Sequence, residues 1–291
     1  MKPAPFGYLA PRSREEALDA LRRFGPEAKL LAGGQSLVPL LAMRLVRPSV
    51  LIDLNRVPDL AYVRPFRGGL AIGAMTRQRA VEADPLAADR IPLLREALRW
   101  VGHPQIRTRG TVGGSLAHAD PSAELPAVAA ALDARFVLAS ARGQRVVDAP
   151  RFFAGYLTTA LEPDEMLVEV RLPALPAGAG WAFAEVARRH GDFALVGVAV
   201  VLGCDPDRRC TEARMAFTGV SHGPMRVVEA EQSLVGRRVT AAAAAETGRI
   251  AQAALEPHSD IHASAAYRRH VAGVLAARAL EQAAARMQVP S

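Results

Sequence analysis

Residues 30–45, LLAGGQSLVPLLAMRL, place two adjacent glycines and two small polar residues between an apolar run and a helix-like segment. The run that ends in Gly33 and Gly34 predicts a strand followed by a glycine turn. Residues 36–48 predict a helix, because Pro39 falls in the first turn and Pro48 closes the segment. A glycine turn that opens into a helix can leave backbone N–H groups unpaired, which suits an anionic ligand.

A second stretch of this kind, TVGGS, occupies residues 111–115 and also predicts a glycine turn. Side chains of Gln35, Ser36, Thr111 and Ser115 could add hydrogen bonds to phosphate oxygens, so two such turns could hold one pyrophosphate. Each turn taken alone could equally be an ordinary connection. Neither matches Gly-x-Gly-x-x-Gly or Gly-x-x-x-x-Gly-Lys-Ser/Thr, which excludes the Rossmann and P-loop fingerprints.

Composition predicts a folded chain of two domains. The 291 residues are 50% hydrophobic and 22% charged, the balance of a globular protein long enough for two cores. No apolar run approaches the ~18 residues of a membrane span, and the N-terminus lacks the core of a signal peptide, so we expect a cytoplasmic protein. Cys204 and Cys210 are the only cysteines, too few to ligate an iron–sulfur cluster.

The net charge of +7 does not predict a nucleic-acid-binding protein. Basic residues are interleaved with apolar and acidic ones instead of forming a tract, and aromatic residues make up only 5% of the chain. Histidines are scattered, and no Cys or carboxylate cluster has metal-ligand spacing, so we expect no metal site. Asp120 could cap the helix that follows it or contact a bound cofactor.

Ser13 and Glu16 form a capping box, which predicts a short helix that ends at Gly25. A hairpin is predicted at residues 67–69, a helix over residues 86–100, and strands over residues 135–140 and 165–173.

Strands and helices alternate irregularly up to the Pro-Gly-Ala run at residues 173–180, which reads as a linker. Beyond it, three strands joined by the turn CDPDRRC precede three helices, which predicts helices on one face of a three-stranded antiparallel sheet. The fold class is therefore α+β. We place one domain at residues 1–175, with subdomains at about 1–56 and 57–175, and a second at 178–288.

Four segments, AGGQSLVPLLAMRL, TVGGSLAHADPSAELPAV, GDFALVGVAV and DIHASAAYRRHVAGVLAARAL, resemble the FAD-binding medium subunit of the molybdenum hydroxylases, the family of carbon monoxide and xanthine dehydrogenases. The likeness extends over nearly the whole chain. It implies a two-part FAD-binding domain of the vanillyl-alcohol oxidase (PCMH) type and a smaller α+β C-terminal domain. It also implies an oxidoreductase subunit that transfers electrons from a partner 2Fe-2S subunit through FAD to an external acceptor.

The resemblance implies a set of cofactor-binding residues and no catalytic residue. Two segments would hold the pyrophosphate and ribityl chain, and further residues would contact the rest of FAD or line the flavin cleft; together they are Leu30, Leu31, Ala32, Gly33, Gly34, Gln35, Ser36, Leu37, Val101, Thr111, Gly113, Gly114, Ser115, His118, Glu124, Leu167 and Phe193. Phe193 could instead be buried in the sheet. A molybdenum-cofactor subunit would complete a heterohexamer-like complex, and its substrate is not encoded in this chain.

One departure from the family concerns the strand AFAEVARR, where some relatives have a lysine and this chain has Ala184 and Glu185. A cation near the flavin would favour its anionic reduced form, so the lack of one leaves the acceptor open. A self-sufficient FAD-dependent oxidase of the same broad fold is the alternative function. It would need an acid or base over the flavin ring, for which only Glu124 and Glu185 are candidates.

Overall fold

The N-terminal part of the molecule is built on a small parallel sheet. The computed structural model describes residues 2–288. Strand β3 (Val50–Asp53) lies between β1 (Gly7–Leu9) and β2 (Ala28–Leu31), parallel to both. Helix α1 (Arg14–Phe24) begins where Ser13 accepts a hydrogen bond from the Glu16 N–H, and η1 (Gly25–Glu27), η2 (Leu54–Arg56) and η3 (Pro58–Leu60) are short 3₁₀ turns.

Helix α2 (Leu37–Ala42) is shorter than the predicted helix over residues 36–48. It ends because Arg44 adopts a left-handed backbone with φ of 58°. The Arg44 N–H then bonds to the Leu41 carbonyl and the Leu45 N–H to the Leu40 carbonyl, which is the hydrogen-bond pattern of a Schellman motif. Pro48 is therefore not the residue that ends the helix.

The middle of the molecule contains a five-stranded antiparallel sheet in the order β4-β5-β10-β6-β7. The predicted hairpin at residues 67–69 is confirmed, since Arg67 and Gly68 both have positive φ between β4 (Val63–Phe66) and β5 (Gly69–Gly73). The strands β6 (Arg135–Ser140) and β10 (Met166–Leu172) were also predicted. Edge strand β7 (Gly143–Asp148) was not, because all but one of its residues are exposed.

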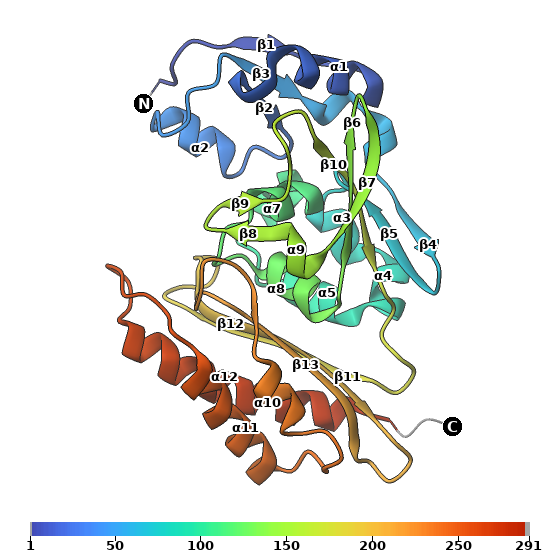
Figure 1. The fold of residues 1–291 in the computed structure, drawn as a ribbon, viewed down its shortest axis with the longest axis vertical. Helices are drawn as coiled ribbons and strands as arrows, with labels where there is room; N and C mark the ends of the chain where they lie inside the picture. Colours follow the sequence, from blue (N-terminus) through green and yellow to red (C-terminus); the bar gives the residue numbers. More distant parts are fainter. Residues whose placement is uncertain (1, 289–291) are drawn as a thin grey trace.

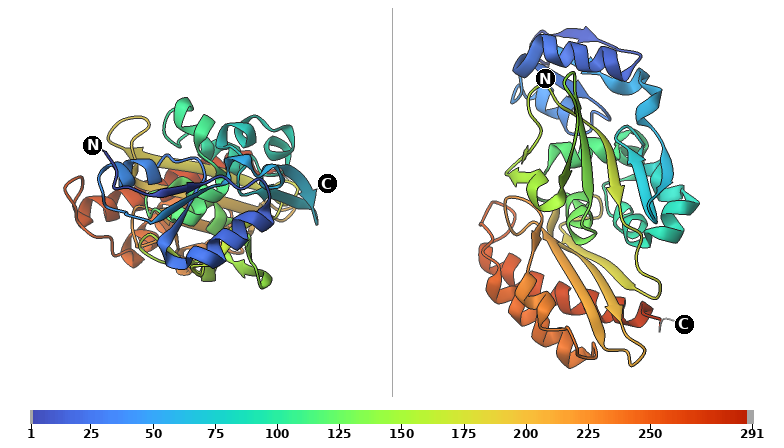
Figure 2. Two further views of the ribbon diagram at one scale, coloured as in Figure 1. Left: turned by 90° about the horizontal axis from the view of Figure 1, so that it is seen from above. Right: turned by 45° about the vertical axis from the view of Figure 1, so that its right-hand side comes forward.

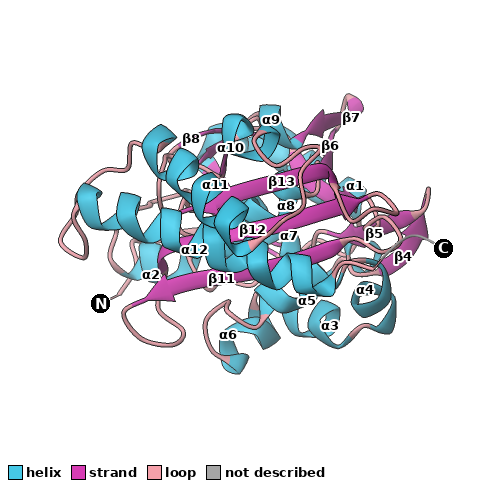
Figure 3. Ribbon diagram, turned by 90° about the horizontal axis from the view of Figure 1, so that it is seen from below, coloured by secondary structure: helices cyan, strands magenta, loops and turns pink. Residues whose placement is uncertain are grey.

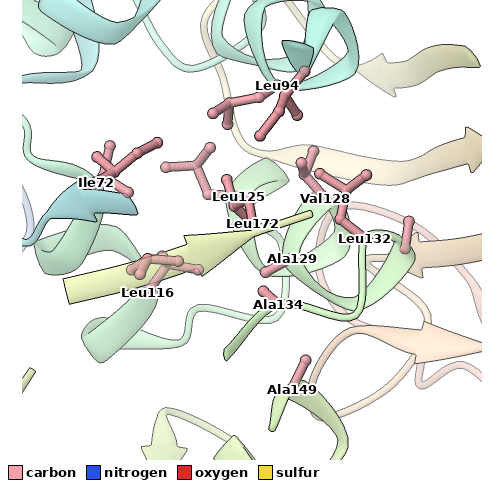
Figure 4. Close-up of a cluster of buried hydrophobic side chains, with 14 of the residues drawn as sticks. Ile72, Leu94, Leu116, Leu125, Val128, Ala129, Leu132, Ala134, Ala149 and Leu172 are labelled. Atoms are coloured by element: carbon pink, nitrogen blue, oxygen red, sulfur yellow. The ribbon is translucent and has the colours of Figure 1, made fainter. Parts of the chain in front are cut away.

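Short helices cover this sheet. The predicted helix over residues 86–100 is two helices, since Pro92 starts a new one. The segment TVGGS is not a turn but the N-cap and first residues of a helix. The elements are α3 (Gln78–Ala83), α4 (Pro85–Arg90), α5 (Pro92–Leu98), α6 (Pro104–Arg109), α7 (Val112–His118), α8 (Glu124–Ala131) and α9 (Ala149–Phe152), with the small hairpin β8 (Phe153–Gly155) and β9 (Thr158–Thr159). Figure 4 shows part of their shared core around Leu116, Leu125 and Leu172.

The C-terminal sheet has four strands, where the sequence predicted three. The order is β11 (Gly180–Ala187), β12 (Ala194–Cys204), β13 (Cys210–Thr218) and β14 (Met225–Arg226), all antiparallel. The fourth strand escapes prediction because it is only two residues long. Helices α10 (Val228–Gln232), α11 (Ala241–Ala254) and α12 (Ala265–Arg286) cover one face (Figure 3). Helices α5 and α8 of the middle part pack on the other, which explains why β12 is apolar on both sides.

The three sheets are stacked along the long axis of the molecule, and the C-terminal helices lie at the end farthest from the N-terminus (Figure 1 and Figure 2). The observed architecture confirms the α+β class. Between β10 and β11 the chain contains no helix or strand. Among the described residues, no helix is both long enough and apolar enough to cross a bilayer.

Candidate functional site

The first glycine loop, residues 32–36, lies at the carboxyl edge of the parallel sheet. Strand β2 ends at Leu31 and runs directly into the loop, while β3 ends beside it at Asp53. Carboxyl ends of parallel strands meet at one edge of a sheet, which is where ligands of such sheets bind. Asn55, just beyond β3, donates from Nδ2 to the Ala32 carbonyl oxygen at 3.0 Å. This contact ties the loop to the neighbouring strand.

The first loop presents unpaired backbone donors. Within residues 2–288, the N–H groups of residues 33–37 find no acceptor in the protein. Gly34 has φ of 75°, a backbone conformation that a residue with a side chain rarely adopts. The Ser36 hydroxyl makes no capping bond to α2. A run of free N–H groups with a free hydroxyl is the arrangement that binds phosphate oxygens.

Gly33 is required by the protein itself. A Cβ atom there would lie 2.5 Å from the Arg109 carbonyl oxygen and 2.8 Å from Gly110 Cα. A Cβ atom on Gly114 would lie 3.4 Å from Ala32 Cβ and 2.6 Å from Thr111 Oγ1. The two glycine segments are therefore packed against each other. The missing side chain of Gly33 allows this close approach of two backbone segments.

The second segment does not offer its backbone to a ligand. The N–H groups of Val112 and Gly113 donate to the carbonyls of Thr76 and Ala74. Those of Gly114 and Ser115 donate to the Thr111 side chain and carbonyl. Two sets of backbone donors were expected to clamp the ligand. Only the first loop has free N–H groups for this purpose. The partly exposed residues of α7 are Gly114, Ser115, Ala117 and His118.

Two arginines make the surroundings of the first loop electropositive. Arg77 donates to the Arg109 carbonyl oxygen and, at 2.5 Å, to Asn55 Oδ1. Burial lowers the pKa of Arg77, and the positive charge of Arg109 adds to this effect. Burial acts to raise the pKa of Asp53, but hydrogen bonds from Tyr8 and Asn55 and the charge of Arg109 together lower it.

Asn55, Arg77 and Arg109 escaped the sequence reasoning. A signal for Asn55 was nevertheless present, since Leu54 and Asn55 directly follow a strand of the parallel sheet, and residues just after such strands gather at the binding edge. Asn55 and Arg77 also line a cavity of about 380 Å³, together with Tyr62 and Met75. No sequence-predicted site residue lines it.

A second group of predicted residues lies where the middle part meets the C-terminal sheet. Glu124, the first residue of α8, is only 6% exposed. Just before it, the carbonyls of Pro121 and Ala123 accept hydrogen bonds from the Thr218 hydroxyl of β13, at 2.6 and 2.9 Å. Burial raises the pKa of Glu124 to about 7, and the nearby Asp120 carboxylate adds to the shift.

Val101 and Phe193 border the same junction from opposite sides. The β11–β12 connection touches the loop after α5, since a Cβ on Gly191 would lie 2.6 Å from the His103 ring. Val101 is half-buried in that loop, and Phe193, at the end of the connection, is 65% exposed. The alternative in which Phe193 is buried in the sheet is therefore wrong.

Other residues considered from the sequence lie elsewhere or act differently. Leu167 is buried in the core of the five-stranded sheet, and its contact with a cofactor stays a prediction. Asp120 does not cap α8, whose N-cap is Ala123; the Asp120 carboxylate instead accepts a hydrogen bond from the Ser122 N–H.

The side chains of His222 and His258 lie close together in exposed loops, with Nε2 atoms 3.3 Å apart. Across residues 2–288, no three His, Cys, Asp or Glu side chains are grouped to hold a metal ion.

Two family models match nearly the whole chain. Residues 4–175 match the family model described as the FAD binding domain in molybdopterin dehydrogenase. Residues 181–283 match the model of the CO dehydrogenase flavoprotein C-terminal domain.

Individual relatives match over their full length. The 6-hydroxypseudooxynicotine dehydrogenase complex subunit alpha of Paenarthrobacter nicotinovorans is 42% identical over 97% of this chain and 96% of its own. The carbon monoxide dehydrogenase medium chain of Hydrogenophaga pseudoflava is 40% identical over 98% of this chain and 99% of its own. The solved structure of carbon monoxide dehydrogenase from that organism superposes with a TM-score of 0.96 at 41% identity, covering 99% of this chain and all of that chain.

Fold, order of segments and full-length similarity agree, and the first loop offers the donors that a pyrophosphate needs. The chain belongs to the family of FAD-binding medium subunits of the molybdenum hydroxylases.

Proposed function

We propose that this chain holds FAD with its pyrophosphate on the first glycine loop and its flavin at the junction of the middle part and the C-terminal sheet. The free N–H groups of residues 33–37, the Ser36 hydroxyl and the field of Arg77 and Arg109 support the first half. Partly exposed Ser115 and His118, buried Glu124 and exposed Phe193 support the second. The residues fit FAD better than FMN, because the anion-binding first loop suits a pyrophosphate.

We propose further that the subunit transfers electrons between a partner 2Fe-2S subunit and an external acceptor. Bound FAD supplies the chemistry, since a flavin can take electrons singly and release them in pairs, while the protein binds and orients it. The observation that carries this proposal is the match over 98% of this chain and 99% of a carbon monoxide dehydrogenase medium chain. Because the matched relative is a medium chain, we propose that other chains of the complex oxidise the substrate.

The proposed partners are a 2Fe-2S subunit and a molybdenum-cofactor subunit, with two copies of each chain in the complex. The relatives' names, a complex subunit and a medium chain, support a multi-subunit assembly. The subunit stoichiometry and a cytoplasmic location stay predictions. Which substrate the complex hydroxylates depends on the molybdenum chain.

Affinity purification from the native source tests the proposal. The chain should copurify with two other subunits, and iron, molybdenum and FAD should be present in constant ratios. Substrate should reduce the flavin in the complex but not in the purified chain alone. Isolation of the chain by itself as a catalytically complete oxidase would establish the alternative function instead.

A further inference from the structure

Glu185 lies in a row of three residues that crosses the C-terminal sheet. Glu185 of β11 pairs with Gly197 of β12, which pairs in turn with Thr218 of β13. Directly paired residues of neighbouring strands project from the same face of a sheet. Gly197 leaves room between its neighbours, because a Cβ there would lie 2.8 Å from the Thr218 methyl carbon and 3.2 Å from Glu185 Cβ.

This row faces the start of α8. Thr218 donates to the carbonyls of Pro121 and Ala123, the residues that lead into Glu124. Glu185 and Glu124 therefore approach each other across the junction, one from the C-terminal sheet and one from the middle part. Both are buried, with exposed fractions of 8% and 6%.

The protein leaves part of this acid pair without a partner. Among the described residues, Glu185 Oε2 is buried and makes no hydrogen bond. Burial, with the Glu124 carboxyl as a second cause, raises the pKa of Glu185 to about 9. A buried oxygen without a partner costs free energy, so its retention needs an explanation such as an absent ligand.

Charged groups on the surrounding elements do not neutralise the pair. Near Glu124, Arg107 donates to Glu82 and to the carbonyls of Val101 and Gly102, and Asp120 adds negative charge. Beside β11, Glu96 of α5 is bound to Arg286, and Arg188 lies 3.5 Å from Asp192. The rings of His103 and His190 lie on the bordering loops, and His118 is the last residue of α7. Besides burial, the charge of the Glu124 carboxyl raises the pKa of Glu185.

We propose that Glu185, paired with Glu124, is a neutral acid of the flavin cleft that donates a hydrogen bond to bound FAD. This inference rests on the proposed position of the flavin at the junction. One of two neighbouring buried carboxyls retains a proton, because both cannot ionise together at low cost. The flavin's polar edge offers acceptors for that proton. A relative with lysine in this strand would present a fixed cation, whereas this chain presents a donor that alkali removes.

The test uses the full chain loaded with FAD. The visible spectrum of the oxidised flavin is recorded as pH is raised, and the midpoint potential of the flavin is measured over the same range. As the pair loses its proton, the spectrum should shift and the flavin should become harder to reduce, because a carboxylate replaces a donor beside the ring. Glu185→Gln keeps a donor that cannot ionise, so its alkaline spectral transition should disappear and its potential should exceed that of the unmodified chain at high pH.

Two further variants separate a flavin contact from a structural effect. Glu124→Gln removes the neighbouring charge, so the remaining transition should move to lower pH. Glu231→Gln changes a buried glutamate of α10 that binds Arg226, away from the junction, and should leave the flavin titration unchanged even if stability falls. A Glu185→Gln variant that titrates like the unmodified chain would overturn the inference. A chain that retains no FAD would overturn the proposed function instead.

Discussion

At the scale of single residues, Gly33 determines whether the two glycine segments can meet. We predict that Gly33→Ala lowers stability by about 1–3 kcal/mol, as overpacking does, and strongly reduces FAD content, because its methyl group would lie 2.5 Å from the Arg109 carbonyl oxygen. Thermal unfolding and the flavin-to-protein absorbance ratio measure the two effects. Gly155→Ala is the matched control, since nothing lies within 4 Å of its added Cβ. Normal FAD content in Gly33→Ala would show that the packing is not required.

The sequence left two hypotheses for Phe193, a contact with the flavin and burial in the sheet, and its exposure excludes the second. At 65% exposure, its replacement by alanine should change the free energy of unfolding by less than about 0.5 kcal/mol. The rate of flavin reoxidation should change several-fold, because the exposed ring borders the proposed flavin cleft. Stopped-flow reoxidation and thermal melting on one preparation check both. Phe217→Ala, at a fully buried site, should cost about 3–5 kcal/mol. Unchanged reoxidation in Phe193→Ala would remove Phe193 from the site.

At the scale of elements, the sequence predicted strands and long helices better than the parts that build the site. The capped start of α1 and the hairpin at residues 67–69 followed from local rules. Segment TVGGS did not, because adjacent glycines disfavour a helix, and α7 also depends on tertiary hydrogen bonds to Ala74 and Thr76 that the sequence does not reveal. For the same reason, Arg77 could not be assigned to the first loop before its distant partners were known.

Arg77 connects these elements, since it bonds to Arg109 and Asn55, each far away in sequence. We predict that Arg77→Met weakens FAD binding tenfold or more, because it removes two charge-assisted hydrogen bonds and a nearby positive charge. Titration of the flavin-free chain with FAD measures the dissociation constant. Arg22→Met, at an exposed position of α1, should leave affinity unchanged. Equal effects of both substitutions would indicate a general dependence on net charge.

At the scale of the whole molecule, the two acids at the junction should link stability to pH. Burial raises the pKa values of Glu124 and Glu185 from 4.5 to about 7 and about 9, so the folded chain holds protons that the unfolded chain releases. Their stabilising contribution is complete below pH 4.5 and is lost as pH rises through about 7 and about 9. We expect the free energy of unfolding in urea to decrease by several kcal/mol from about pH 5 to about pH 9, since each acid contributes about 1.4 kcal/mol per pH unit below its folded-state pKa. Glu185→Gln should show a smaller decrease, and an identical slope would contradict the linkage.

The junction also shows what a single sequence could not predict about the molecule. Resemblance pointed to Glu124 and to an unusual Glu185, but only the packing of α8 on β13 brings the two carboxyls together. Periodicity within each segment describes which face is buried, and it contains no information on which buried faces meet. The family match gives the order of the two domains along the chain. The contacts between them are known only from the folded structure.

The central claim is that the first glycine loop binds the pyrophosphate of FAD, and the most direct measurement compares FAD with FMN. The chain is stripped of flavin and titrated with each cofactor, with protein fluorescence and flavin absorbance as the signals. FMN lacks the second phosphate and the adenosine, so we predict binding at least about 100-fold weaker than FAD, equivalent to about 2.8 kcal/mol or two lost hydrogen bonds to a charged group. Equal dissociation constants for FAD and FMN would contradict the claim.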